Sequence, residues 1–248
     1  MEMRLITAIS FLWISFVLGQ LPPEIEKCEA GDSICIAETV TRLLRLYPKG
    51  LPSIGLQALD AIRFENVVVS RIEPNSPATL DLKFRNLTVR GLEGATVMEA
   101  KGFDGELPRV LELSAWVPLL KLEGDYEMHG SLLNMPIQGK GQAQVVVKEG
   151  RFRCKVRALE QLRKDGKRYI EIAKVKCLLD LQGMHLNFEN LFNNPELSDA
   201  MNIVANTKWL EIWHALRKGI ISTVDRLVET ILKRVADKLP YDDFYREL

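Results

Sequence analysis

The residue types that catalyse reactions are present in this chain, but they do not fall into catalytic spacings. The nearest approach to the Gly-x-Ser-x-Gly elbow of hydrolases runs from Gly50 to Gly55, and Leu51 stands where its first glycine should be. The sequence has no P-loop, Gly-x-Gly-x-x-Gly fingerprint or His-Glu-x-x-His motif. We therefore expect no enzymatic activity and no cofactor, and a secreted lipid hydrolase is the least supported hypothesis.

Cysteines offer disulfide or metal chemistry. Cys28 and Cys35 enclose a short loop that a local disulfide could close. Cys154 and Cys177 lie opposite each other if the chain forms a two-residue hairpin turn at Asp165-Gly166. Counting outward from such a turn puts Cys154 and Cys177 at a hydrogen-bonded pair of positions, where side chains stand further apart than at a non-bonded pair, and a bulge could relieve this.

A metal site is the alternative use of these residues. The three histidines His129, His185 and His214 are scattered, and no cysteine has a partner at zinc-finger spacing. His185 and Glu189 would merely share one face of an expected strand. We expect no metal ion.

The N-terminus indicates secretion. Residues 1–19 combine Arg4, an apolar run of signal-peptide length and small residues before a cut at Gln20. As a helix the 14 residues from Leu5 to Leu18 would rise about 21 Å, too little to cross a membrane. We expect one extracellular domain over 20–248, and the acceptor Asn86-Leu87-Thr88 makes Asn86 a candidate glycosylation site.

Charge excludes a general polyanion binder, because 33 Lys and Arg balance 33 Asp and Glu. The segment 148–176 is nevertheless basic, with 11 Lys and Arg against 4 Asp and Glu. An exposed hairpin protected at its edge by charge explains it best. One alternative is that this hairpin contacts an anionic membrane or a glycan. Another is that the protein is an extracellular signalling protein that binds its partner through this hairpin, with any bound lipid serving only a structural role. Nucleic acid is not an expected partner.

The middle of the chain alternates as antiparallel strands do. Apolar and polar residues alternate over 120–129, 80–85 and 151–158. Glycine-marked connections are expected at 91–94, 139–141, 149–150 and 165–166, with no long helix between about 64 and 181. This pattern argues against a parallel α/β enzyme fold.

Helices are expected at both ends. Asp32 is a candidate cap for a helix that stops at Pro48, and Asn194-Pro195 is a typical helix start. A third helix, about 48 Å long, is predicted over 207–239 with a wide apolar face. A monomer in which this face packs in a concave sheet is favoured over a coiled-coil dimer, whose seam would be narrower.

Short strings in order along the mature chain resemble the takeout and juvenile hormone binding protein family of insects. The strings are Leu21-Pro22 with Cys28 and Cys35, Gly50-Leu51-Pro52, Gly124-Asp125-Tyr126, Leu133 to Gly141, Gly166 to Tyr169, Phe188 to Asn193, Asn206 with Trp209, and Leu239-Pro240-Tyr241 with Phe244. The first cysteine pair matches the N-terminal disulfide of that family. Ala61 and Asn194 depart from residues common there, and many takeout members lack the second cysteine pair.

The resemblance implies an α+β TULIP-like fold: a strongly curved antiparallel sheet wrapped around a long C-terminal helix, with an elongated hydrophobic tunnel between them. It also implies a secreted carrier of a terpenoid, fatty acid or related lipid, with links to circadian, feeding or chemosensory physiology. Tyr126 could orient a polar ligand group. The candidate tunnel-lining residues are Phe84, Trp116, Tyr126, Met128, Phe152, Trp213, Leu216, Ile220 and Val224.

Overall fold

The structure is a computed structural model that describes residues 21–71, 78–132 and 135–246, so the expected signal peptide lies outside the described residues. The α-helices and strands, in chain order, are α1 (Ser33–Leu46), β1 (Ile62–Arg71), β2 (Ala78–Arg90), β3 (Thr96–Lys101), β4 (Arg109–Leu132), β5 (Met135–Leu162), β6 (Arg168–Asp180), β7 (Gly183–Phe188), α2 (Pro195–Thr207) and α3 (Trp209–Ala236). Short 3-10 turns occur at Pro52–Ile54, Leu92–Gly94 and Tyr241–Phe244.

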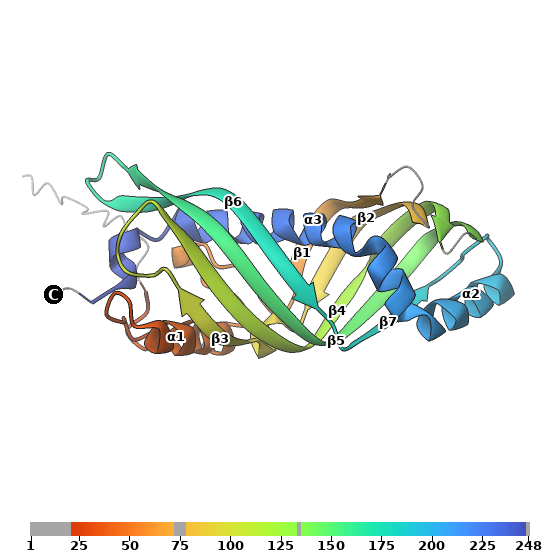
Figure 1. Ribbon diagram of the computed structural model, residues 1–248, viewed down its shortest axis with the longest axis horizontal. Helices are drawn as coiled ribbons and strands as arrows, with labels where there is room; N and C mark the ends of the chain where they lie inside the picture. The colour runs from red at the N-terminus through yellow and green to blue at the C-terminus, as the bar shows by residue number, and fades with distance from the viewer. Residues whose placement is uncertain (1–20, 72–77, 133–134, 247–248) are drawn as a thin grey trace, which may run out of the picture.

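The strands form one antiparallel sheet whose path is β1-β2-β4-β5-β6. The two longest strands, β4 and β5, run side by side along the molecule (Figure 1). In one half they are flanked by β3 and β6, and in the other half by β2 and β7. The sheet curves around α3, as the apolar face of that helix predicts, and the described residues between β1 and β6 contain no α-helix.

β4 and β5 change the face they bury at their midpoint. Pro118 and Glu149 are skipped in the β4–β5 register, and Glu149 has a φ of 48°. On β4, odd-numbered residues such as Val117 are buried before this point and even-numbered ones such as Leu120 after it. The connection expected at 149–150 is therefore wrong, because these residues form an irregularity inside one strand that re-aims its side chains.

The connection expected at 139–141 is also wrong, because these residues lie inside β5. Gly139 and Gly141 do not form a turn; they allow neighbouring residues to come close to the backbone of β5. A Cβ on Gly139 would lie 2.6 Å from the Tyr126 hydroxyl, and one on Gly141 would lie 2.7 Å from the Glu189 carbonyl oxygen. The segment after β7 can rest on β5 only because both side chains are missing.

The C-terminal helical region is divided at Lys208, so the single helix expected over 207–239 is shorter and begins later. α3 has 28 residues, about 42 Å of helix. In the last turn of α2, the Asn206 amide donates to the Asn202 carbonyl oxygen and the Thr207 hydroxyl to that of Ile203. No proline or glycine marks the break, at which Lys208 has a φ of −108° and a ψ of 26°.

α3 lies between the outer strands β1 and β6 and covers an edge of each. On the β6 side, the buried Asp225 carboxylate accepts the Cys177 backbone N–H at 2.7 Å and the Lys176 ammonium at 2.8 Å. On the β1 side, the Val68 carbonyl oxygen accepts from Thr223 Oγ1 and Arg226 Nη2, each at 3.0 Å. The helix thus supplies polar partners to strand edges that would otherwise be exposed.

α2 gives the edge strand β7 partners in the same way. Asn194 caps α2 by accepting the Leu197 N–H, as its sequence predicts. The Asn206 amide bonds both the N–H and the carbonyl of Leu186, and the Asn202 amide bonds both groups of Phe188. One face of the helix therefore carries amides that replace a neighbouring strand.

The β5–β6 hairpin joins Cys154 to Cys177 by a disulfide. The predicted pairing is correct, but the two-residue turn is not: Leu162 pairs with Arg168, and Gly166 has a φ of 77° at the end of a longer loop. A bulge at Arg157/Ala158 then shifts the register by one and restores the pairing. The Cα atoms are 4.1 Å apart, near the spacing of a non-hydrogen-bonded pair, and the Cys177 N–H is free to meet α3.

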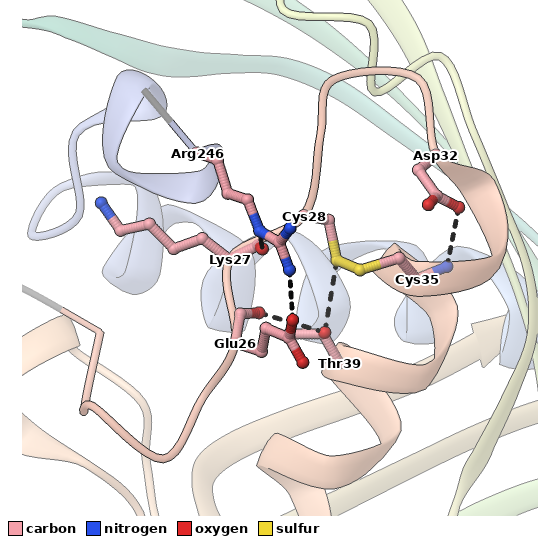
Figure 2. The surroundings of a disulfide bond; sticks show 7 residues. All are labelled: Glu26, Lys27, Cys28, Asp32, Cys35, Thr39 and Arg246. Atoms are coloured by element: carbon pink, nitrogen blue, oxygen red, sulfur yellow. Dashed lines mark hydrogen bonds and ion pairs between the residues drawn. A yellow bond between two sulfur atoms is a disulfide. The ribbon is translucent and has the colours of Figure 1, made fainter. Parts of the chain in front are cut away.

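The second disulfide, Cys28–Cys35, fixes the N-terminal segment to α1 (Figure 2). Asp32 Oδ1 accepts the Cys35 N–H at 3.0 Å, which confirms Asp32 as the cap of α1. The C-terminus returns to the same place, where Arg246 Nε donates to the Lys27 carbonyl oxygen at 2.7 Å and its guanidinium pairs with Glu26. Both ends of the described chain are thus anchored together.

Candidate functional site

A cavity of about 200 Å³ lies between the concave face of the sheet and the helices α2 and α3. It occupies the half of the molecule that holds β2 and β7. Seven of the residues predicted to line a tunnel are on its wall. They are Phe84, Met128, Phe152, Trp213, Leu216, Ile220 and Val224.

Trp116 is not on this wall, and its predicted position is wrong. Simple alternation from Leu120 would place Trp116 on the inward face of β4, because both residues are even-numbered. At Pro118, however, the inward face of the strand changes from odd-numbered to even-numbered residues. Trp116 therefore points to the outer side of the sheet with its partners Thr96 and Arg151. It lines a separate surface depression instead of the cavity.

Tyr126 faces inward but is also not on the cavity wall. Its ring stacks edge-on against Phe188, with centroids 5.0 Å apart, and its hydroxyl donates to the Glu189 carbonyl oxygen at 2.6 Å. Only 1% of the residue is exposed, and burial raises the pKa of Tyr126 to about 12. The hydroxyl therefore holds the segment after β7, and the predicted role in orienting a ligand finds no support in this position.

Sequence reasoning did not name any of the remaining wall residues as lining candidates. The further wall residues are Val69, Leu80, Leu82, Leu120, Leu122, Leu132, Ile137, Val145, Val147, Leu179, Leu181, Met184, Leu186, Leu191, Phe188, Met201, Asn202, Ala205 and Ile212. Alternation along β7 and the spacing of Met201 and Ala205 on α2 were signals that could have found part of this set.

Among the described residues, the cavity wall offers no free polar group. Asn202 is the only polar residue in this part of the wall, and its amide is already hydrogen-bonded. Asn202 Oδ1 accepts the Phe188 N–H at 3.0 Å, while Nδ2 donates to the Phe188 carbonyl oxygen at 2.9 Å. An occupant of this space must therefore bind through apolar contact, because a buried polar atom would find no partner.

The cavity is smaller than most ligand pockets, which measure about 300–1,000 Å³. Its wall, however, includes the three methionines Met128, Met184 and Met201. Methionine side chains are unbranched and adapt to irregular shapes. We expect the cavity to take a slender ligand as it stands and to enlarge around a bulkier one by rotation of these side chains.

The basic segment 148–176 is partly neutralised within the chain. Arg163 pairs with Asp237, Lys167 with Asp243 and Arg168 with Asp242, so the hairpin tip docks on the acidic C-terminal segment. These three pairs neutralise part of the excess positive charge of the segment. They reduce the number of bases available for an anionic membrane, a glycan or a protein partner.

The other predicted sites can be placed as follows. Asn86 is exposed at a register shift in β2, where its amide donates to Asp125 at 3.1 Å. A glycan attached to this side chain would therefore not have to be buried. The residues that the structure describes contain no cluster of three His, Cys, Asp or Glu able to hold a metal ion. No helix in the described ranges is long and apolar enough to cross a membrane.

Comparison with known proteins agrees with this architecture. The chain is 24% identical over 241 residues to circadian clock-controlled protein daywake of Drosophila yakuba, covering 94% of this chain and 93% of the relative. It is 24% identical over 230 residues to the Drosophila melanogaster protein of the same name, covering 91% and 88%.

The crystal structure of Takeout 1 from Epiphyas postvittana superposes with a TM-score of 0.75 at 22% identity, covering 90% of this chain and all of that one. This likeness shows the fold, a TULIP-like curved sheet around a C-terminal helix. The family model described as haemolymph juvenile hormone binding protein (JHBP) matches residues 5–246. The chain belongs to the takeout and juvenile hormone binding protein family.

Proposed function

We propose that this protein is a secreted, monomeric and non-catalytic carrier of a hydrophobic small molecule such as a terpenoid, fatty acid or related lipid. The observation that carries the proposal is the cavity, whose described wall is apolar except for Asn202, an amide that is already hydrogen-bonded. Apolar surface removed from water contributes about 25 cal/mol per Å² before the costs of association.

Membership of a family described by a hormone-binding protein of the haemolymph supports both carriage and secretion. The likeness to daywake supports a link to circadian physiology, and feeding or chemosensory roles belong to the same proposal. The expected signal peptide over 1–19 supports export, after which the mature chain would begin at Gln20.

Native mass spectrometry of protein from a eukaryotic secretion host, before and after organic extraction, tests whether a lipid is carried. We expect a removable mass of lipid size. Protein that emerges without such a mass and also refuses added lipids would contradict the proposal.

A substitution pair then tests whether the cavity holds the lipid. Val224→Phe adds a ring inside the cavity, while Val204→Phe makes the same change on α2 at a residue 38% exposed to solvent. We expect Val224→Phe to lower lipid affinity at least about 10-fold, because the new ring takes up part of a small cavity. Equal uptake by both folded variants would place the ligand elsewhere.

A further inference from the structure

The surface depression that contains Trp116 adjoins the cavity. It measures about 870 Å³ and lies over the middle of the sheet, beside α3. Phe152 and Leu179 belong both to the cavity wall and to the lining of this depression. The two spaces are therefore separated only by the layer that these residues form.

Five charged residues line the depression, namely Glu149, Arg151, Arg153, Asp180 and Arg217. None of the five makes an ion pair within the part of the chain that the structure describes. Four of them are well exposed, so water satisfies them. Arg217 differs, because it is half-buried and comes from α3, the helix that lines the cavity.

The Arg217 guanidinium is incompletely bonded. Its Nε atom is buried and has no hydrogen-bond partner among the described residues, and its Nη2 donates to the Leu179 carbonyl oxygen at 3.3 Å, a long bond. It also lies 5.9 Å from the centroid of the Trp213 ring. Both Leu179 and Trp213 are cavity-wall residues, so this unsatisfied cation stands directly behind the wall.

We propose that Arg217 binds the carboxylate of an amphipathic ligand whose hydrocarbon tail occupies the cavity. This inference rests on the proposed carrier function and names its ligand class, a single-chain organic acid. The cavity offers the tail only apolar contact, and the head needs a partner outside it. Arginine suits that task, because Nε and Nη2 can bond both oxygens of one carboxylate.

Dodecanoic acid and methyl dodecanoate test this assignment, because they share a chain and differ at the carboxylate. Affinities are measured at neutral pH by displacement of N-phenyl-1-naphthylamine. The variants are Arg217→Gln, Arg217→Lys and the control Arg234→Gln, which removes an exposed charge from the same helix. Thermal melting checks that each variant folds.

We expect the wild type and Arg234→Gln to prefer the acid by about 10-fold or more. Arg217→Gln should lose that preference and keep its affinity for the ester, and Arg217→Lys should retain part of it. An unchanged preference in Arg217→Gln, or none in the wild type, would overturn the head-group site while ester binding upholds the carrier. If neither compound binds the wild type, both proposals fail. Should Arg217→Gln not fold, Arg217→Lys decides: full retention of the preference contradicts a bidentate site.

Discussion

Asp225 is a buried polar link between α3 and the β6 edge, and Asp225→Ala would measure its strength. Asp225 is 6% exposed, and its carboxylate accepts the Cys177 backbone N–H at 2.7 Å. Alanine would leave that N–H without a partner, and losing a charged acceptor from a buried donor costs about 1.5–3 kcal/mol. The Lys176 side chain is 63% exposed, so its ion pair adds less than about 1 kcal/mol.

We therefore expect Asp225→Ala to lower the free energy of unfolding by about 3 kcal/mol. For a chain of this size that corresponds to a fall in Tm of about 6–12 °C. Urea unfolding with the disulfides intact, followed by circular dichroism, measures the free energy, and a thermal scan measures Tm.

Two control variants separate the backbone bond from the ion pair. Asp225→Asn keeps an oxygen for Cys177 and should lose only about 1 kcal/mol, whereas Lys176→Met should lose less than about 1 kcal/mol. Equal losses in Asp225→Asn and Asp225→Ala would refute the argument, because the backbone bond would then contribute nothing. An Asp225→Ala protein as stable as wild type would refute it as well.

The remaining predictions concern the sheet and its surface. Because burial raises the pKa of Tyr126 to about 12, above the roughly 10 of an unfolded tyrosine, its contribution to stability is present below about pH 10 and lost as pH rises through about 12. Urea titrations over that range should show a smaller alkaline loss for Tyr126→Phe than for wild type, and an equal loss would contradict the assignment. Replacing Cys154 and Cys177 together by alanine opens a loop of sequence separation 23 and should cost about 3 kcal/mol in the same assay; no change would mean that the bond does not constrain the unfolded chain. Thr88→Val should remove a glycan-sized mass from secreted protein if Asn86 is the acceptor, and an unchanged mass would exclude this site.

Periodicity predicted the elements that hold the cavity better than it predicted their ends. The alternation around Leu120 and Phe152 and the stripe from Trp213 to Val224 indicate the inward faces, because each lies within one uninterrupted period. The division of the C-terminal helices at Lys208 could not be predicted, because no proline or glycine in the sequence marks it.

The errors have local physical causes. Trp116 was assigned to the wrong face because one skipped residue on each strand reverses the alternation, and only the structure shows the skip at Pro118 and Glu149. The predicted pairing of Cys154 with Cys177 is correct although the predicted hairpin turn is wrong, because the bulge at Arg157/Ala158 offsets the longer loop. The cation behind the cavity wall, Arg217, had no sequence signal at all, since its position relative to Leu179 arises from tertiary packing.

The way α3 covers the edges of β1 and β6 affects the tendency of this protein to aggregate. Exposed strand edges are templates for intermolecular pairing, and here the edges of β1 near Val68 and of β6 near Cys177 are both occupied by side chains of a single helix. The Val68 contacts join residues more than 150 positions apart, so they cannot form until the C-terminal part of the chain is present. A fragment ending before α3 would lose part of its cavity wall and expose these edges of β1 and β6, and we expect such a fragment to aggregate.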